Sequence, residues 1–112
     1  MKKSKIIKES SIFDDVIRNG KILKNRYYNI FYLENNLNKP LFGFAIGKKI
    51  GNAVTRNKNK RQIKAIIDEN ISLFSNPCYY IIMLKKEINE INFQDKKDSL
   101  ISLISKGDKN EK

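Results

Sequence analysis

With 112 residues, of which 40% are hydrophobic, the chain can form one domain with a modest core but not two. It carries 23 lysines and arginines against 12 acidic residues, and this net charge of +11 at pH 7 predicts a polyanionic partner. There is no histidine and only one cysteine, which excludes Ser-His-Asp catalysis, histidine-ligated zinc and an internal disulfide framework.

The first predicted elements are a helix and a strand. The segment 6–20 predicts a short helix, which Gly20 can close in the left-handed conformation. Its apolar residues share one face at helical spacing: Ile12, Phe13, Val16 and Ile17. The segment 27–33 alternates with period two, which predicts a strand. One face of this strand carries Tyr27, Asn29, Phe31 and Leu33.

A second strand is predicted over residues 41–47, after a turn at 34–40 that indicates a hairpin loop. Large apolar residues alternate with small ones along this strand. The large residues are Phe42, Phe44 and Ile46, and the small ones are Gly43, Ala45 and Gly47. Small residues on one face of a sheet allow another element to approach closely, so we expect a helix to pack there.

A long helix is predicted from Ala53 to about Leu73 or somewhat less, with Asn52 as its N-cap. Its carboxyl half carries an apolar stripe: Ile63, Ile66, Ile67, Ile71 and Phe74. Cations surround most of the circumference of its amino half: Arg56, Lys58, Lys60, Arg61 and Lys64. The amino half therefore cannot be buried on all sides, and we expect it to project into solvent or onto a ligand.

The remaining elements complete a small α+β fold. Residues 78–84 form a continuous apolar strand, expected in the centre of the sheet with Cys78 as a buried thiol. A last amphipathic helix follows, with Phe93, Leu100, Ile101 and Ile104 on one face. The element order αββαβα predicts a two-layer sandwich with a central sheet.

We expect a single domain over residues 1–112, with an ordered core at about 5–106 and a frayed basic tail at 107–112. No apolar run approaches the roughly 18 residues of a membrane span. The lone cysteine fits a reducing compartment, so we expect a cytoplasmic protein with no membrane partner.

The positive charge is concentrated in one segment. Between Glu34 and Asp68 the chain has eight basic residues and no acidic one. Cations near the start of a helix oppose its macrodipole, and here they have no acidic neighbours to pair with. The unfavourable dipole interaction and the repulsion among the cations are both offset when phosphates lie along the helix. Nucleic acid is therefore the predicted partner, and the interleaved amides favour RNA: Asn52, Asn57, Asn59 and Gln62.

The string "KKIGNAVTRNKNKR" at residues 48–61 resembles the signature of the bacterial ribonuclease P protein component, K-K-x-G-N-A-V-x-R-N-R-x-K-R. The matching residues are Lys48, Lys49, Gly51, Asn52, Ala53, Val54, Arg56, Asn57, Lys60 and Arg61. The segment 13–33 resembles the amino-terminal block and following strand of the family. The resemblance covers roughly residues 5–106.

The resemblance implies a subunit of an endoribonuclease that removes the 5′ leader from precursor tRNA. The catalyst of this ribonucleoprotein is its RNA, which holds the Mg²⁺ ions that activate water and stabilise the leaving oxygen. The protein alone is not expected to cleave, and it has no predicted catalytic or metal-ligating residue. Its implied partners are one catalytic RNA per protein and the leader of the precursor. The family also implies a left-handed βαβ crossover carrying the basic helix.

The resemblance also implies two sets of site residues. The residues expected to bind RNA are Lys48, Lys49, Asn52, Arg56, Asn57, Lys58, Lys60, Arg61 and Lys64. The residues expected to line the leader cleft, between the first helix and the sheet, are Phe13, Ile17 and Phe31.

Four positions depart from the family pattern. Lys58 replaces an arginine, and Asn59 replaces an aliphatic residue, which leaves the packing of the helix at that position open. Ile17 stands in place of phenylalanine, and Phe31 in place of tyrosine. Our hypothesis is that leader affinity depends more strongly on Phe13 and Phe31 because the cleft offers less stacking area.

Two alternatives compete with this interpretation. A basic ribosomal or assembly protein would have the same composition, and only the string at residues 52–61 favours ribonuclease P over it. A stand-alone nuclease would need converging Asp and Glu residues for a two-metal site, whereas the carboxylates here are dispersed.

Overall fold

The computed structural model describes residues 1–110, with side chains up to residue 106, and has a mixed α+β fold. Its helices are α1 (Ser10–Asn19), α2 (Ala53–Glu69) and α3 (Phe93–Asn110). Its strands are β1 (Lys21–Lys24), β2 (Tyr28–Glu34), β3 (Leu41–Ala45) and β4 (Cys78–Leu84). Four short 3-10 helices connect them: η1 (Lys3–Lys5), η2 (Lys48–Ile50), η3 (Ile71–Phe74) and η4 (Lys86–Glu90). The α+β class is confirmed, and β1 is an additional strand that the predicted order lacks.

The four strands form one sheet in the order β1-β2-β4-β3. Strand β4 is central, with β2 antiparallel on one side and β3 parallel on the other. The prediction of a hairpin loop at residues 34–40 is therefore wrong, because β2 and β3 both pair with β4 and not with each other. The continuous apolar sequence of β4 is buried on both faces, including the thiol of Cys78, so β4 takes the central position between β2 and β3.

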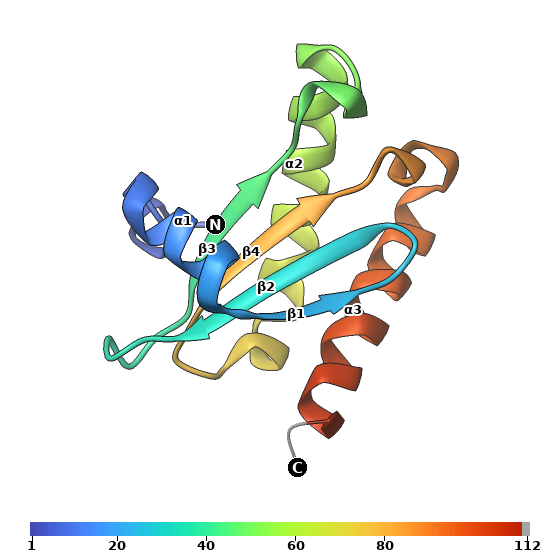
Figure 1. Ribbon diagram of the computed structural model, residues 1–112. Helices are drawn as coiled ribbons and strands as arrows, with labels where there is room; N and C mark the ends of the chain where they lie inside the picture. The colour runs from blue at the N-terminus through green and yellow to red at the C-terminus, as the bar shows by residue number, and fades with distance from the viewer. Residues whose placement is uncertain (111–112) are drawn as a thin grey trace.

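The larger core lies between the sheet and two helices. Side chains of α2 and α3 pack there against the sheet residues Tyr28, Ile30, Phe42, Tyr80, Ile82 and Leu84. Figure 1 shows α2 and α3 behind the sheet and α1 in front of it. Helix α1 therefore adds a partial third layer to the expected sandwich.

The connection from β3 through α2 to β4 is a crossover between two parallel strands. In Figure 1 both strands point upward with β4 to the right of β3, and α2 passes behind the sheet. This arrangement is left-handed, against the general rule for βαβ units.

Two glycines, Gly20 and Gly43, lie where α1 packs closely against the sheet. Gly20 has φ −78°, so it does not close the helix in the left-handed conformation. A Cβ on Gly20 would lie 2.5 Å from the Val16 carbonyl oxygen and 2.7 Å from that of Tyr32, so close approach of α1 to β2 explains the glycine. The expected packing on the small-residue face is present, since a Cβ on Gly43 would lie 2.7 Å from the Phe13 ring.

The ends of two helices can be compared with the prediction. Helix α2 ends at Glu69, within the shorter range that the prediction allowed, and the buried Phe74 belongs to η3. Helix α3 continues to Asn110, into the segment predicted as a frayed tail, of which residues 111–112 lie outside the described part. Within residues 1–110, no helix combines the length and the apolar content that crossing a bilayer requires.

Candidate nucleic-acid interface

The start of α2 is shaped by a glycine and an asparagine. Gly51 has φ +145°, a conformation that favours glycine, and a Cβ there would lie 3.0 Å from the Thr55 methyl group. The next residue, Asn52, caps the helix, because its side-chain oxygen accepts a hydrogen bond of 2.9 Å from the Thr55 backbone N–H. The oxygen of Asn52 therefore serves the cap, although the sequence predicts this residue as an RNA contact.

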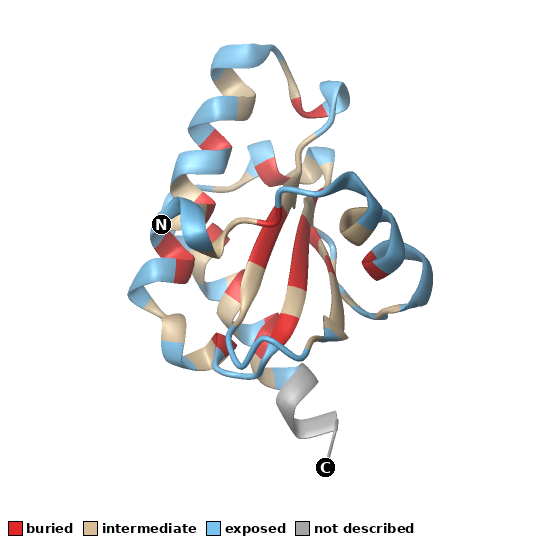
Figure 2. Cartoon of the chain, turned by 90° about the vertical axis from the view of Figure 1, so that its left-hand side faces the viewer, coloured by how far each residue is buried: buried red, intermediate tan, exposed pale blue. Residues whose placement is uncertain are grey.

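The other residues predicted to bind RNA lie on η2 and on the amino half of α2. Exposed positions are occupied by Lys48, Lys49, Asn57, Lys58, Lys60 and Arg61. Arg56 and Lys64 are half-buried. Figure 2 shows the predominantly exposed amino half of α2, in contrast to the buried strands. The structure thus brings the predicted set together on one projecting end of the molecule.

None of these cations is paired within the described side chains. The ion pairs found there join the Met1 amino group to Asp68, Arg26 to Glu90, and Lys97 to Glu69. The cations on η2 and the amino half of α2 form a surface that we call the η2–α2 surface. The described carboxylates do not neutralise its positive field, which leaves it available to a polyanion.

Four of the predicted residues lie along the β3 side of α2: Arg56, Asn57, Lys60 and Lys64. A cleft of about 230 Å³ there is lined by Phe44, Ile46, Ala53, Arg56, Asn57 and Lys60. The Nε of Arg56 is buried and has no hydrogen-bond partner among the described residues, while the Nζ of Lys64 lies 5.8 Å from the centre of the Phe44 ring. The aromatic contact orients Lys64, since a cation over a ring face is attracted by its quadrupole.

Asn59, the position whose packing the sequence left open, is buried and hydrogen-bonded. Its Nδ2 donates to the Thr55 carbonyl at 3.1 Å and to the Asn89 side chain at 3.2 Å. Its Oδ1 accepts a bond of 3.0 Å from the Nζ of Lys96, which is itself buried on α3. Burial lowers the pKa of Lys96, and the nearby charge of Lys58 lowers it further. Sequence analysis did not identify this network, because its members are far apart in the chain.

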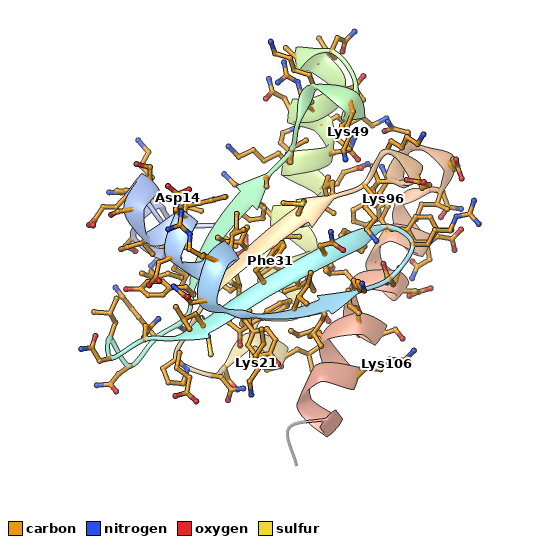
Figure 3. All side chains as sticks on the ribbon, viewed as in Figure 1. Asp14, Lys21, Phe31, Lys49, Lys96 and Lys106 are labelled. Carbon is orange, nitrogen blue, oxygen red and sulfur yellow. The ribbon has the colours of Figure 1, made fainter. Side chains whose placement is uncertain are left out.

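The predicted leader cleft lies on the other face of the sheet, beside α1. Phe13 and Phe31 are half-buried and pack against the small cluster of Ile7, Val16 and Ile81. Figure 3 shows Phe31 near the middle of this face. Ile17 is 37% exposed, so the structure leaves apolar surface open here.

This face also contains residues that the sequence-based list lacks. Ile22 is 45% exposed and lies directly opposite Phe31 in the pairing of β1 with β2. Its absence from the list follows from the missed strand, because residues 21–24 are Lys-Ile-Leu-Lys and show no period-two alternation. Asn29 approaches Met83 through its Nδ2, at 3.9 Å from the sulfur, and its Oδ1 is buried without a partner. Tyr27 precedes β2 and packs against the larger core, so its predicted place beside Phe31 is wrong.

The family model described as Ribonuclease P matches residues 1–108. The chain belongs to the ribonuclease P protein family. The resemblance seen in the signature is thereby confirmed, and the ribosomal and stand-alone nuclease alternatives lose their support.

Similar proteins agree with this assignment. A ribonuclease P protein component from Mycoplasma capricolum is 39% identical over 105 residues, covering 93% of this chain and 96% of the relative. A solved ribonuclease P protein from Staphylococcus aureus has a TM-score of 0.87 at 24% identity, covering 94% and 96% of the two chains. One from Thermotoga maritima has a TM-score of 0.82 at 22% identity, covering 89% and 94%. At these identities the two structures support the fold.

Proposed function

We propose that the chain is the RNA-binding subunit of a ribonuclease P ribonucleoprotein and assists 5′ maturation of precursor tRNA in the cytoplasm. The observation that carries the proposal is the unpaired positive surface of η2 and α2 in a member of this family. One protein binds one catalytic RNA through this surface. The RNA performs the cleavage with Mg²⁺ that it holds itself, and the protein contributes binding and orientation.

The η2–α2 surface suits binding to an RNA backbone. Its lysines and arginines project from one helix and one short turn, so they can contact successive phosphates. Each contact releases counterions, and affinity should fall with salt at a log–log slope of roughly −0.7 to −0.9 per contact. The dipole at the start of α2 adds to this attraction.

The opposite face of the sheet suits the 5′ leader. Phe31, Ile17 and Ile22 provide partly exposed apolar surface on which an unpaired nucleotide can rest. Phe13 is packed against Gly43, so its part in the cleft is to hold α1 at the sheet as well as to offer a ring edge. Stacking on rings has little base preference, which fits a subunit that accepts many leaders.

The test is processing of a precursor tRNA by ribonuclease P RNA at low Mg²⁺, with and without the protein. We expect strong stimulation by the wild type and its loss in the Arg56→Ala/Arg61→Ala variant. The matched control is Lys21→Ala/Lys106→Ala, which removes the same charge at exposed positions away from Lys49 (Figure 3) and should still stimulate. Tight, salt-sensitive RNA binding without stimulation would overturn the proposal and favour a ribosomal or assembly role.

A further inference from the structure

Lys96 is a buried cation without a carboxylate partner among the described side chains. The residue is 6% exposed, and its Nζ donates to the side-chain oxygens of Asn59 at 3.0 Å and Gln62 at 2.8 Å. A buried ammonium is costly unless its donors are satisfied, so both amides are held in fixed orientations around it. Lys96 thereby links α3 to the middle of the basic helix.

The network continues from α2 to the turn before it. Asn59 donates to the side chain of Asn89 in η4, and Asn89 donates to the Ile50 carbonyl at 2.6 Å. Ile50 ends η2, the turn that carries Lys48 and Lys49. The same chain of hydrogen bonds therefore reaches both elements of the η2–α2 surface, and Lys96 and Lys49 lie toward the same end of the molecule (Figure 3).

Apolar packing is sparse within the amino half of α2, although Ile50 just before it is buried in the larger core. The buried residues of α2 are Asn59, Ile63, Ile66 and Ile67, so apolar packing begins only at Ile63. Before that point Asn59 is the buried residue, and the basic side chains on either side of it, Lys58 and Lys60, are exposed. Hydrophobic contacts anchor the carboxyl half of the helix, and polar contacts anchor the half that carries the cations.

We propose that Lys96 is a positioning residue for RNA binding: through Asn59, Gln62 and Asn89 it holds η2 and the amino half of α2 in the orientation that presents their cations to RNA. This inference rests on the proposed function for the identity of the ligand. Lys96 itself is too buried to contact phosphate, so it acts through the orientation of other residues.

The test compares Lys96→Met with Lys97→Met in binding to ribonuclease P RNA. Each variant removes one positive charge, but Lys97 is half-buried, and its one ion pair among the described side chains is with Glu69, at 3.6 Å. We expect Lys96→Met to weaken binding about tenfold and Lys97→Met to change it by less than about twofold. The salt slope of Lys96→Met should match that of the wild type, because no phosphate contact is removed.

Two further variants separate positioning from loss of stability. Ile104→Val truncates a buried side chain elsewhere in the larger core. It should lose about as much thermal stability as Lys96→Met but leave RNA affinity unchanged. Asn59→Leu removes the acceptor of the Lys96 bond and the donor to Asn89 while keeping Lys96, so it should weaken RNA binding to a similar extent as Lys96→Met. Unchanged binding by Lys96→Met, or equal weakening by Ile104→Val, would overturn the proposal.

Amide hydrogen exchange without RNA distinguishes this proposal from the proposed function. We expect faster exchange over residues 53–62 in Lys96→Met but not in Lys97→Met. That result, together with a wild type that fails to bind ribonuclease P RNA, would refute the proposed function while leaving the structural link intact. Unchanged exchange in Lys96→Met would overturn the link itself.

Discussion

The two faces of the sheet are built differently. On the face covered by α2 and α3, the rings of Phe42, Phe74 and Tyr80 are almost fully buried, and their centroids lie 5.4–5.5 Å apart. On the face beside α1, Phe31 is only half-buried, and Ile17 and Ile22 remain exposed. One face is covered by α2 and α3, whereas the other retains exposed apolar surface beside α1. The comparison teaches that similar aromatic residues become closed core or partly exposed surface according to what covers them.

The largest effect is expected on the covered face. Phe42→Ala removes a ring that contacts both Phe74 and Tyr80, and should lower the free energy of unfolding by about 3–5 kcal/mol. Chemical denaturation measures this loss. RNA affinity of the molecules that remain folded should be unchanged, and a loss of less than about 1 kcal/mol would contradict the closed packing described here.

The open face should show the reverse pattern. Phe31→Ala should weaken binding of a precursor tRNA to the reconstituted ribonucleoprotein by about 1–3 kcal/mol, because a stacking surface is lost. The matched control is a tRNA without a 5′ leader, whose affinity should not change. Equal weakening for both RNAs, or little change for the precursor, would refute the assignment of Phe31 to the leader cleft.

A pH-dependent effect is expected at Tyr28 on the covered face. Its hydroxyl donates to the Lys96 carbonyl at 2.9 Å, and burial raises the pKa of Tyr28 well above its usual range. As the pH rises, the Tyr28 hydroxyl ionises in the unfolded chain before it ionises in the folded protein. The contribution of Tyr28 to the free energy of unfolding is therefore complete below about pH 10 and declines above it. Tyr28→Phe should cost about 1–2 kcal/mol at pH 7. Chemical denaturation from pH 7 to 11 should show that the stability difference between the wild type and Tyr28→Phe becomes smaller above pH 10. A constant difference would contradict the raised pKa.

The smallest effect is expected at Asn29 on the open face. Its buried Oδ1 has no hydrogen-bond partner, so Asn29→Val should raise the free energy of unfolding by about 1 kcal/mol or less. Thermal denaturation measures the gain. Asn59→Val is the contrasting variant, since Asn59 is fully engaged with Thr55, Asn89 and Lys96 and should lose stability. A gain in both variants would show that the two amides are equivalent.

Local patterns were enough to predict much of this molecule. The period-two alternation in β2 and β3, the apolar run of β4 and the stripe in the carboxyl half of α2 depend on neighbouring residues, so they can be read from the chain. The helix predicted from Ala53 likewise carries the cations of its amino half, where the structure has them.

What failed depends on partners distant in sequence. Strand β1 is short and pairs only with β2, so its four residues carry little signal of their own. The apolar run of β4 predicts its central position, which the structure confirms. The pairing of β2 and β3 with β4 instead of with each other depends on which strand edges meet, and no single segment records that. The polar role of Asn59 likewise required Lys96, which lies 37 residues later in the chain.

By itself, the sequence determined the α+β class, the concentration of positive charge and the family signature, because periodicity, charge and motif spacing are local properties. Only the tertiary structure decided the strand order, the exposure of Phe31 and Ile22, and the buried contact between Lys96 and Asn59. These features depend on which surfaces meet, and desolvation makes each contact favourable or costly only once both partners are in place.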